Sequence, residues 1–359
     1  MRWLAFLLIF LGFALALEVR VLLGEEEEGV VEVFGPHAVW TSGGKLFSRE
    51  KGAKYRVRLY GGGVWVEGRN YGPLVSFVPK GGDFAALGRR YPGFLRLLAR
   101  EKGLLWVNVV EIETYLEGVL PGEMPAWFPL EAQKAQAVIA RTYALERLGS
   151  HPDYDLCASA RCQVYLGRAE ASPAYRGAIR ATKGLLLAYR GRPIKAVYHA
   201  DSGGTTATSR EVWGKSYPYL TARPDPYTRA RRWRREPPAD EVSAVLAAMG
   251  LRVGEFYGFK VLARTESDRI GRLLVWGSQG QHELAVPQVT SFLRRLGLPS
   301  TMAWVEGGRV FVGRGLGHGV GLSQWGAKGL AERGYDYREI LGHYYPGTVL
   351  APYQVQARR

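Results

Sequence analysis

The sequence predicts an α+β protein, in which a small N-terminal β-rich domain precedes a larger mixed domain with a cleft. Short apolar or alternating runs that end in Gly or Pro fill residues 17–103, as expected for strands. An alanine-rich helical run follows near residue 130, and strands then alternate with short helices. With 359 residues, the chain is long enough for two hydrophobic cores. We therefore expect domains at 17–103 and 104–352.

Residues 1–16 predict a cleavable signal peptide. Arg2 precedes an apolar run from Trp3 to about Phe13, and the small-x-small triplet "ALA" follows at 14–16. A retained membrane anchor is the weaker alternative, because the run is shorter than the roughly 20 residues of a spanning helix. We expect an exported protein of the cell envelope or the extracellular space.

The charge balance predicts an acidic partner. The formal net charge is +15, and the run "RARRWRREPP" at 229–238 concentrates it. For an exported basic protein, we expect cell-wall carboxylates and phosphates as partners and no nucleic acid. The alternative for this run is a solvated surface loop.

The elements of the larger domain follow in order. A buried strand at "LLWVNVVEIE" leads into a turn, where Pro121, Pro125 and Pro129 are expected to exclude a regular helix around Glu123. A helix of roughly 30 Å should then run from Pro129 to Gly149, with alanines that allow close packing on all sides.

The C-terminal third predicts a helix near 239–249 and, further on, a glycine-rich arm. Glycine occupies every second position from 313 to 321, which indicates either a flexible loop or an extended segment that its neighbours approach closely. Helix starts are expected at Ser323 and at Asp336, the latter with Glu339 in capping-box spacing.

Glu123 is the leading candidate for chemistry. We expect Leu120, Met124, Trp127 and Phe128 to desolvate its carboxyl group and to raise the pKa above about 4.3, as a general acid requires. The alternative is a glutamate that merely caps the following helix.

Four stretches carry a family resemblance: "NVVEIETYLEGVLPGEMP", "FPLEAQKAQAVIARTYAL", "YHADSGGTT" and "GRGLGHGVGLSQWGAKGLAERG". They resemble, in order, the signature blocks of the stage II sporulation protein D (SpoIID/LytB) family. The resemblance implies a lytic transglycosylase that cuts peptidoglycan glycan strands between N-acetylmuramic acid (MurNAc) and N-acetylglucosamine (GlcNAc). It also implies that Glu123, in the G-E-M-P block, is the catalytic residue of a substrate cleft.

A lytic mechanism needs one carboxylate, whereas ordinary glycosidases use two. The 6-hydroxyl of the sugar replaces water and yields a 1,6-anhydro end, and no cofactor is required. Glu131 and Asp153 are lower-ranked second acids, since the helix macrodipole already explains a negative charge at Glu131.

The resemblance extends to substrate binding. Lys134 and Arg141 match family positions, so they are expected to bind substrate carboxylates or to orient Glu123; ion pairs with Glu131 or Glu146 are the alternative. A serine-hydrolase triad in "YHADSGG" is rejected, because such near neighbours cannot converge. The other expected substrate contacts are His199, Ser202, Gly203, Gly204, Thr205, His318 and Gln324.

The cysteine segment leaves three alternatives open. Cys157 and Cys162 form a disulfide, bind a structural zinc ion together with His151, or stay free. Some family members bind zinc here through two histidines and two cysteines, but Arg161 stands where one ligand would be. We place the disulfide ahead of zinc, and neither would be catalytic.

Two functions of different classes remain. We favour the exported lytic transglycosylase that acts on peptidoglycan glycan strands. The LytB branch implies the other function, a glycan-binding module that enhances a separate cell-wall amidase without cutting the glycan.

Overall fold

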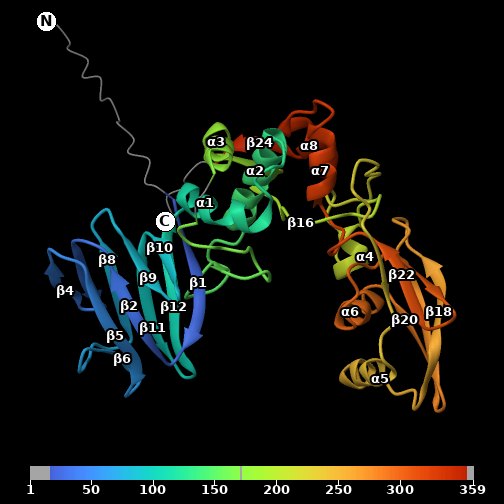
Figure 1. Cartoon of the computed structure of the whole chain (residues 1–359), viewed down its shortest axis with the longest axis horizontal. Coiled ribbons are helices and arrows are strands. Elements are labelled where there is room, and N and C mark those ends of the chain that lie inside the picture. Colours follow the sequence, from blue (N-terminus) through green and yellow to red (C-terminus); the bar gives the residue numbers. More distant parts are fainter. Residues whose placement is uncertain (1–16, 170–171, 354–359) are drawn as a thin grey trace, which may run out of the picture. The chain divides into compact units, whose positions relative to one another are not determined.

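The computed structural model describes residues 17–169 and 172–353, so the expected signal peptide lies outside the described residues. The chain forms two compact units (Figure 1). Unit 1 comprises Met1–Tyr115, Gly149–Cys162 and Pro352–Arg359, and unit 2 comprises Leu116–Leu148 and Gln163–Ala351. The expected boundary after residue 103 differs from this division, because the strand after it, β12 (Gly103–Glu111), pairs with β1 and β11 in a sheet of unit 1.

Unit 1 contains two sheets, which confirms the predicted N-terminal β-rich region. One has the strand order β13-β1-β12-β11-β8-β3-β4 and the other β10-β9-β2-β5-β6-β7. Trp106 of β12 is fully buried, and a Cβ on Gly29 of β2 would lie 2.8 Å from its ring, so Gly29 lets the sheets pack face to face. The strands are β1 (Glu18–Glu26), β2 (Glu28–Val33), β3 (His37–Thr41), β4 (Gly44–Arg49), β5 (Ala53–Tyr60), β6 (Gly63–Val66), β7 (Arg69–Asn70), β8 (Leu74–Pro79), β9 (Asp83–Ala86), β10 (Arg89–Pro92), β11 (Phe94–Arg100), β12 and β13 (Leu156–Cys157).

The chain returns to unit 1 through β13, which pairs in parallel with β1. Asp155, just before it, accepts hydrogen bonds from the backbone N–H and the guanidinium of Arg20. This return contributes only a two-residue strand, which explains why periodicity in the sequence does not signal it.

The expectation that the prolines exclude a helix around Glu123 is wrong. Helix α1 (Ile112–Glu123) passes through Pro121 and ends at Glu123. Pro121 lies in the last turn of the helix, so its missing N–H removes one hydrogen bond close to the helix end. Helix α2 (Leu130–Glu146) follows Pro129 as predicted and is buried on nearly all sides, with contacts to α3, α7, α8 and β14.

The remaining elements all lie in unit 2 or end at its border. They are α3 (Pro173–Ala181), β14 (Leu185–Tyr189), β15 (Arg192–Pro193), β16 (Tyr198–His199), α4 (Ser209–Trp213), β17 (Arg232–Arg235), α5 (Ala239–Ala248), β18 (Phe256–Arg264), β19 (Ile270–Gly277), β20 (Gly280–Ala285), α6 (Gln288–Arg295), β21 (Ala303–Glu306), β22 (Val310–Arg314), β23 (Leu322–Ser323), α7 (Gln324–Ala331), α8 (Tyr337–Tyr344) and β24 (Val349–Pro352). Helix α5 confirms the helix predicted near 239–249.

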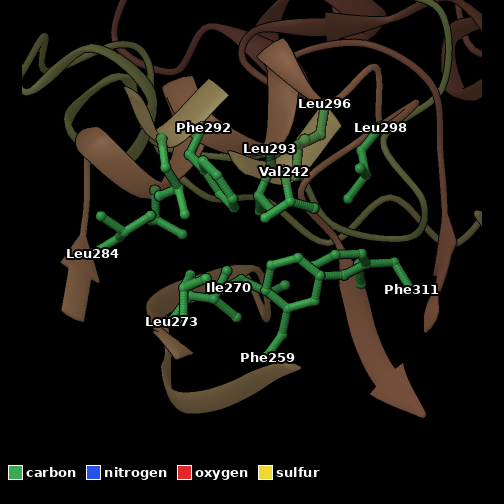
Figure 2. Close-up of a cluster of buried hydrophobic side chains, with 14 of the residues drawn as sticks. Val242, Phe259, Ile270, Leu273, Leu284, Phe292, Leu293, Leu296, Leu298 and Phe311 are labelled. Atoms are coloured by element: carbon green, nitrogen blue, oxygen red, sulfur yellow. The ribbon is translucent and has the colours of Figure 1, made fainter. Parts of the chain in front are cut away.

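A hydrophobic core forms where α5 and α6 meet the strands β18, β19 and β22. Val242 of α5 and Phe292 of α6 pack with Phe259, Leu273 and Phe311 of the strands (Figure 2). All five side chains are at most 2% exposed, so this part of unit 2 has a core of its own.

The glycine arm is a segment that its neighbours approach closely, and its glycines from 315 to 321 have positive φ. A Cβ on Gly321 would lie 2.0 Å from the carbonyl oxygen of Val197, and φ there is +71°, which favours glycine. The arm leads into β23, which pairs in parallel with β16. Helices α7 and α8 then begin after the caps Ser323 and Asp336, as predicted, the second with the expected capping box.

None of the helices in the described ranges combines the length and the apolar character that crossing a membrane requires.

Candidate active site

The carboxyl group of Glu123 lies at the C-terminal end of α1, in unit 2. Its Oε1 accepts a hydrogen bond from the N–H of Val164 at 2.6 Å, and the hydroxyl of Tyr198 donates a second one. Burial raises the pKa of this carboxyl group, and the two hydrogen bonds lower it without cancelling the rise. Glu123 therefore keeps its proton to a higher pH than a free glutamate, as a general acid must.

Two glycines of α1 bring the Val164 segment to the acid. Gly118 and Gly122 are one helical turn apart, and a Cβ on Gly122 would lie 2.8 Å from the carbonyl oxygen of Val164. The N–H of Leu166 also donates to the carbonyl of Gly118 at 2.9 Å. The i, i+4 glycine pair is thus a signal for close approach that the sequence analysis overlooked.

The apolar surroundings of Glu123 match the expectation in part. The side chains of Leu120, Met124 and Phe128 are at most 3% exposed. Trp127 is 63% exposed and packs instead beside Phe128 and Trp325, so it presents its ring to solvent. The chain turns at Pro125, where the carbonyl accepts from the N–H of Phe128, and this turn directs Phe128 rather than Trp127 inward.

Tyr198 is a site residue that the sequence analysis missed. It lies in β16, and its hydroxyl accepts a hydrogen bond from Gln163 Nε2 at 3.3 Å while it donates to Glu123. Its backbone also hydrogen-bonds the ring of His318. The only signal in the sequence is its place directly before His199 in the "YHADSGG" stretch.

His199 and His318 lie together, with ring centroids 5.5 Å apart. His199 Nδ1 hydrogen-bonds the carbonyl of Val320, and His318 Nδ1 accepts from the N–H of Val320. Burial, with help from the nearby Arg269, lowers the pKa of His318 to about 4 and that of His199 well below its usual value. Both rings are therefore neutral at pH 7 and brace the glycine arm against β16.

The "DSGGT" loop is anchored by a buried polar network. The hydroxyl of Ser202 donates to Asp225 at 2.6 Å, and Asp225 also accepts from Tyr344 at 2.9 Å. Arg269 donates to the carbonyls of Ser202 and Thr205 at 2.8 and 2.9 Å. The N–H groups of Gly203 and Gly204 bond to Asp201 and Ser202.

The side chain of Ser202 is fully buried and committed to Asp225. The Ser202 side chain therefore helps to hold the loop in place. Asp225 and Arg269 are members of this network that the sequence analysis did not single out.

Gln324 connects the glycine arm to the acid. As the first residue of α7, it donates through Nε2 to the backbone carbonyl of Glu123 at 2.8 Å and to Gln136 at 3.4 Å. The blocks that contain Glu123 and Gln324, 201 residues apart, thus meet in the fold.

The two basic candidates on α2 lie differently. Lys134 forms the ion pair with Glu131 that was the alternative for it, at 2.5 Å. Arg141 is fully buried and donates to the carbonyl of Leu185 at 3.0 Å. Glu131 also accepts a hydrogen bond from the N–H of Tyr337, so both of its carboxylate oxygens make structural contacts.

The cysteine segment belongs to unit 1. Cys157 and Cys162 are joined in a disulfide, the arrangement placed first from the sequence. His151 stacks on Tyr154, and its Nδ1 accepts from the N–H of Asp153, whose carboxylate pairs with Arg100. Across 17–169 and 172–353, no three His, Cys, Asp or Glu side chains gather as a metal site.

Comparisons with known proteins cover the same segments. A family model described as stage II sporulation protein matches residues 100–189, and one described as a domain of unknown function matches 225–321. The chain is 30% identical over 305 residues to an uncharacterized protein of Brachyspira hyodysenteriae, covering 81% of this chain and 78% of the relative.

Two relatives come from Bacillus subtilis. Its stage II sporulation protein D is 28% identical over 272 residues, covering 68% of this chain and 76% of the relative. Its amidase enhancer is 33% identical over 297 residues, covering 66% of this chain but only 40% of the relative. The family model spans Glu123 and its hydrogen-bond donor Val164, whereas Tyr198 lies beyond the matched residues. Together with these relatives, the match shows that the chain belongs to the stage II sporulation protein D family.

Proposed function

We propose that the protein is an exported lytic transglycosylase that cleaves the MurNAc–GlcNAc bond of peptidoglycan glycan strands, with Glu123 as acid and base. A relative named stage II sporulation protein D and one named amidase enhancer support a role at the cell wall. The observation that carries the proposal is the partly buried Glu123 carboxyl group, whose pKa is raised by desolvation and whose position is held by Val164 and Tyr198.

The reaction begins with the protonated carboxyl group. Glu123 donates its proton to the glycosidic oxygen, the C1–O bond breaks, and positive charge develops on the MurNAc ring. The GlcNAc end leaves as an alcohol. The hydrogen bonds from Val164 and Tyr198 stabilise the carboxylate that forms, because both donors already point at it.

The same carboxylate completes the reaction. It takes the proton of the MurNAc 6-hydroxyl while that oxygen attacks C1, which closes the 1,6-anhydro ring and returns Glu123 to its acid form. No water enters the product, so a second carboxylate is unnecessary. The lower-ranked acids support this assignment, since Glu131 is paired with Lys134 and Asp153 with Arg100.

The amidase enhancer relative favours one other function, a module that binds glycan and stimulates a separate cell-wall amidase. In that case the site around Glu123 would hold a strand without cutting it. The glycan strand is the common partner of both functions.

The test uses purified protein with peptide-free and with peptide-bearing glycan strands in ¹⁸O-labelled water. We expect products lighter by one water than hydrolytic products, without the label, and loss of nearly all cleavage in Glu123→Gln, since acid–base catalysis contributes about 10² to 10⁴ in rate. Labelled reducing ends would mark a hydrolase, and full activity of Glu123→Gln would remove Glu123 from the reaction. A native protein that cuts nothing but stimulates an added amidase would establish the other function.

A further inference from the structure

A group of three aromatic rings, of which Trp127 is exposed, lies on α7 and the turn after α1; we call it the aromatic surface, composed of Trp127, Phe128 and Trp325. The rings of Trp127 and Trp325 have centroids 5.7 Å apart, and Phe128 lies 4.8 and 5.2 Å from the two. Trp127 is 63% exposed, while Phe128 is buried and supports it from below. The contacts therefore hold a large apolar ring in place at the surface, where burial would otherwise be favoured.

The aromatic surface adjoins the acid. Trp325 follows Gln324, which donates to the backbone carbonyl of Glu123. Trp127 lies four residues after Glu123, in the turn that Pro125 and Phe128 close. The aromatic surface therefore lies close to the backbone of Glu123 in the fold.

Two cations flank the rings. The guanidinium of Arg229 lies 5.0 Å from the ring centroid of Trp325, and Lys328 lies 5.5 and 5.8 Å from Trp127 and Trp325. Lys328 also pairs with Glu332, whereas no carboxylate within 17–169 and 172–353 pairs with Arg229. Arg229 is exposed, so its charge is available to an anionic ligand.

The position of Arg229 is built into the packing of α7. A Cβ on Gly326 would lie 2.2 Å from the Asp225 carboxyl group, and one on Gly329 would lie 2.3 Å from the carbonyl oxygen of Tyr227. These glycines let the segment that leads to Arg229 lie directly on the helix.

We propose that the aromatic surface and Arg229 form a subsite for a pyranose sugar that carries a carboxylate. The C–H groups on one face of such a ring stack on Trp127, because the electron-rich indole face attracts their partial positive charge. The carboxylate binds the Arg229 fork. The inference rests on the proposed function for its substrate class, in which MurNAc with its lactyl carboxylate is the acidic sugar.

The test measures binding by calorimetry to Glu123→Gln, which leaves the probes uncut. The probes are a peptide-free GlcNAc–MurNAc tetrasaccharide and chitotetraose, which has the same length but no carboxylate. Trp127→Ala should weaken binding of both probes about tenfold, equal to about 1.4 kcal/mol. Arg229→Gln should weaken only the tetrasaccharide with carboxylates, by a similar factor.

Matched controls are available on the same chain. Trp40→Ala removes a tryptophan of unit 1 that is 42% exposed, and Arg232→Gln removes an exposed charge three residues after Arg229. Neither should change the affinity for either probe. Equal losses in Arg232→Gln would mean general attraction of polyanions, and unchanged binding in Trp127→Ala would leave no stacking; each result overturns the subsite.

The subsite and the proposed reaction fail separately. If native protein cuts no glycan but binding depends on Trp127 and Arg229 as stated, the subsite stands without the transglycosylase. If native protein cuts glycan and the Trp127 and Arg229 variants bind and cut as their parents do, the reaction stands and the subsite is overturned. Absence of binding to both probes also overturns it.

Discussion

Removing the hydroxyl of Tyr198 offers a direct test of how the site controls Glu123. The hydroxyl donates to the carboxyl group and lowers its pKa, in opposition to burial, which raises it. In Tyr198→Phe this donor is lost, so the ionised form becomes less stable and the pKa of Glu123 rises further. Activity that depends on protonated Glu123 should then persist to higher pH, because the carboxyl group keeps its proton longer.

The magnitude follows from the type of hydrogen bond. A hydrogen bond to a charged group contributes about 1.5–3 kcal/mol, and the descending limb of the pH–rate profile moves by about one pH unit for each 1.36 kcal/mol. The maximal rate should fall, because the lost donor also stabilises the carboxylate that forms when the bond breaks. The assay is kcat/KM for glycan cleavage between pH 4 and 9.

Tyr143→Phe is the matched control. Tyr143 is also buried, and its ring centroid lies 6.5 Å from that of Tyr198. Its side-chain hydrogen bond, however, is to Arg147, and burial is the main cause of its own raised pKa. This variant should leave the descending limb in place. A profile that does not move in Tyr198→Phe, or that moves equally in Tyr143→Phe, would refute the reasoning.

Three further predictions concern packing, the disulfide and pH. Gly122→Ala should reduce cleavage and stability, because its Cβ would lie 2.8 Å from the Val164 carbonyl oxygen and displace a donor to the acid; activity and thermal unfolding measure this, and wild-type values would contradict it. Non-reducing mass spectrometry should show a two-proton deficit from the bond between Cys157 and Cys162; two free thiols would exclude the disulfide, and one retained zinc ion in native spectra would favour the metal site. The free energy of unfolding should fall as pH drops from about 6.5 toward about 4, because burial holds the pKa of His318 at about 4 and the unfolded chain takes up the proton first. Denaturant titrations measure the free energy of unfolding at pH 7 and pH 5, and the difference between the two values should be smaller in His318→Gln. An unchanged difference in this variant would exclude His318 as the cause.

The sequence by itself determined the features that depend on local signals. Alternating apolar runs predicted the β-rich N-terminal unit, and Ser323 and Asp336 predicted two helix starts, because a cap and its partners lie within one turn. The block around Glu123 likewise predicted the candidate acid, because its residues are neighbours in the sequence. Pro121 was misjudged, because it removes only one hydrogen bond close to the end of α1 and the helix passes through it.

Only the tertiary structure decided what surrounds the acid. The N–H of Val164 and the hydroxyl of Tyr198 come from segments 41 and 75 residues away, and Gln324 comes from 201 residues away. The same is true of Ser202 and Asp225, which meet in a buried hydrogen bond. Such contacts depend on how distant segments pack, and packing leaves no periodic pattern in the chain, so residue types and spacing alone do not specify it.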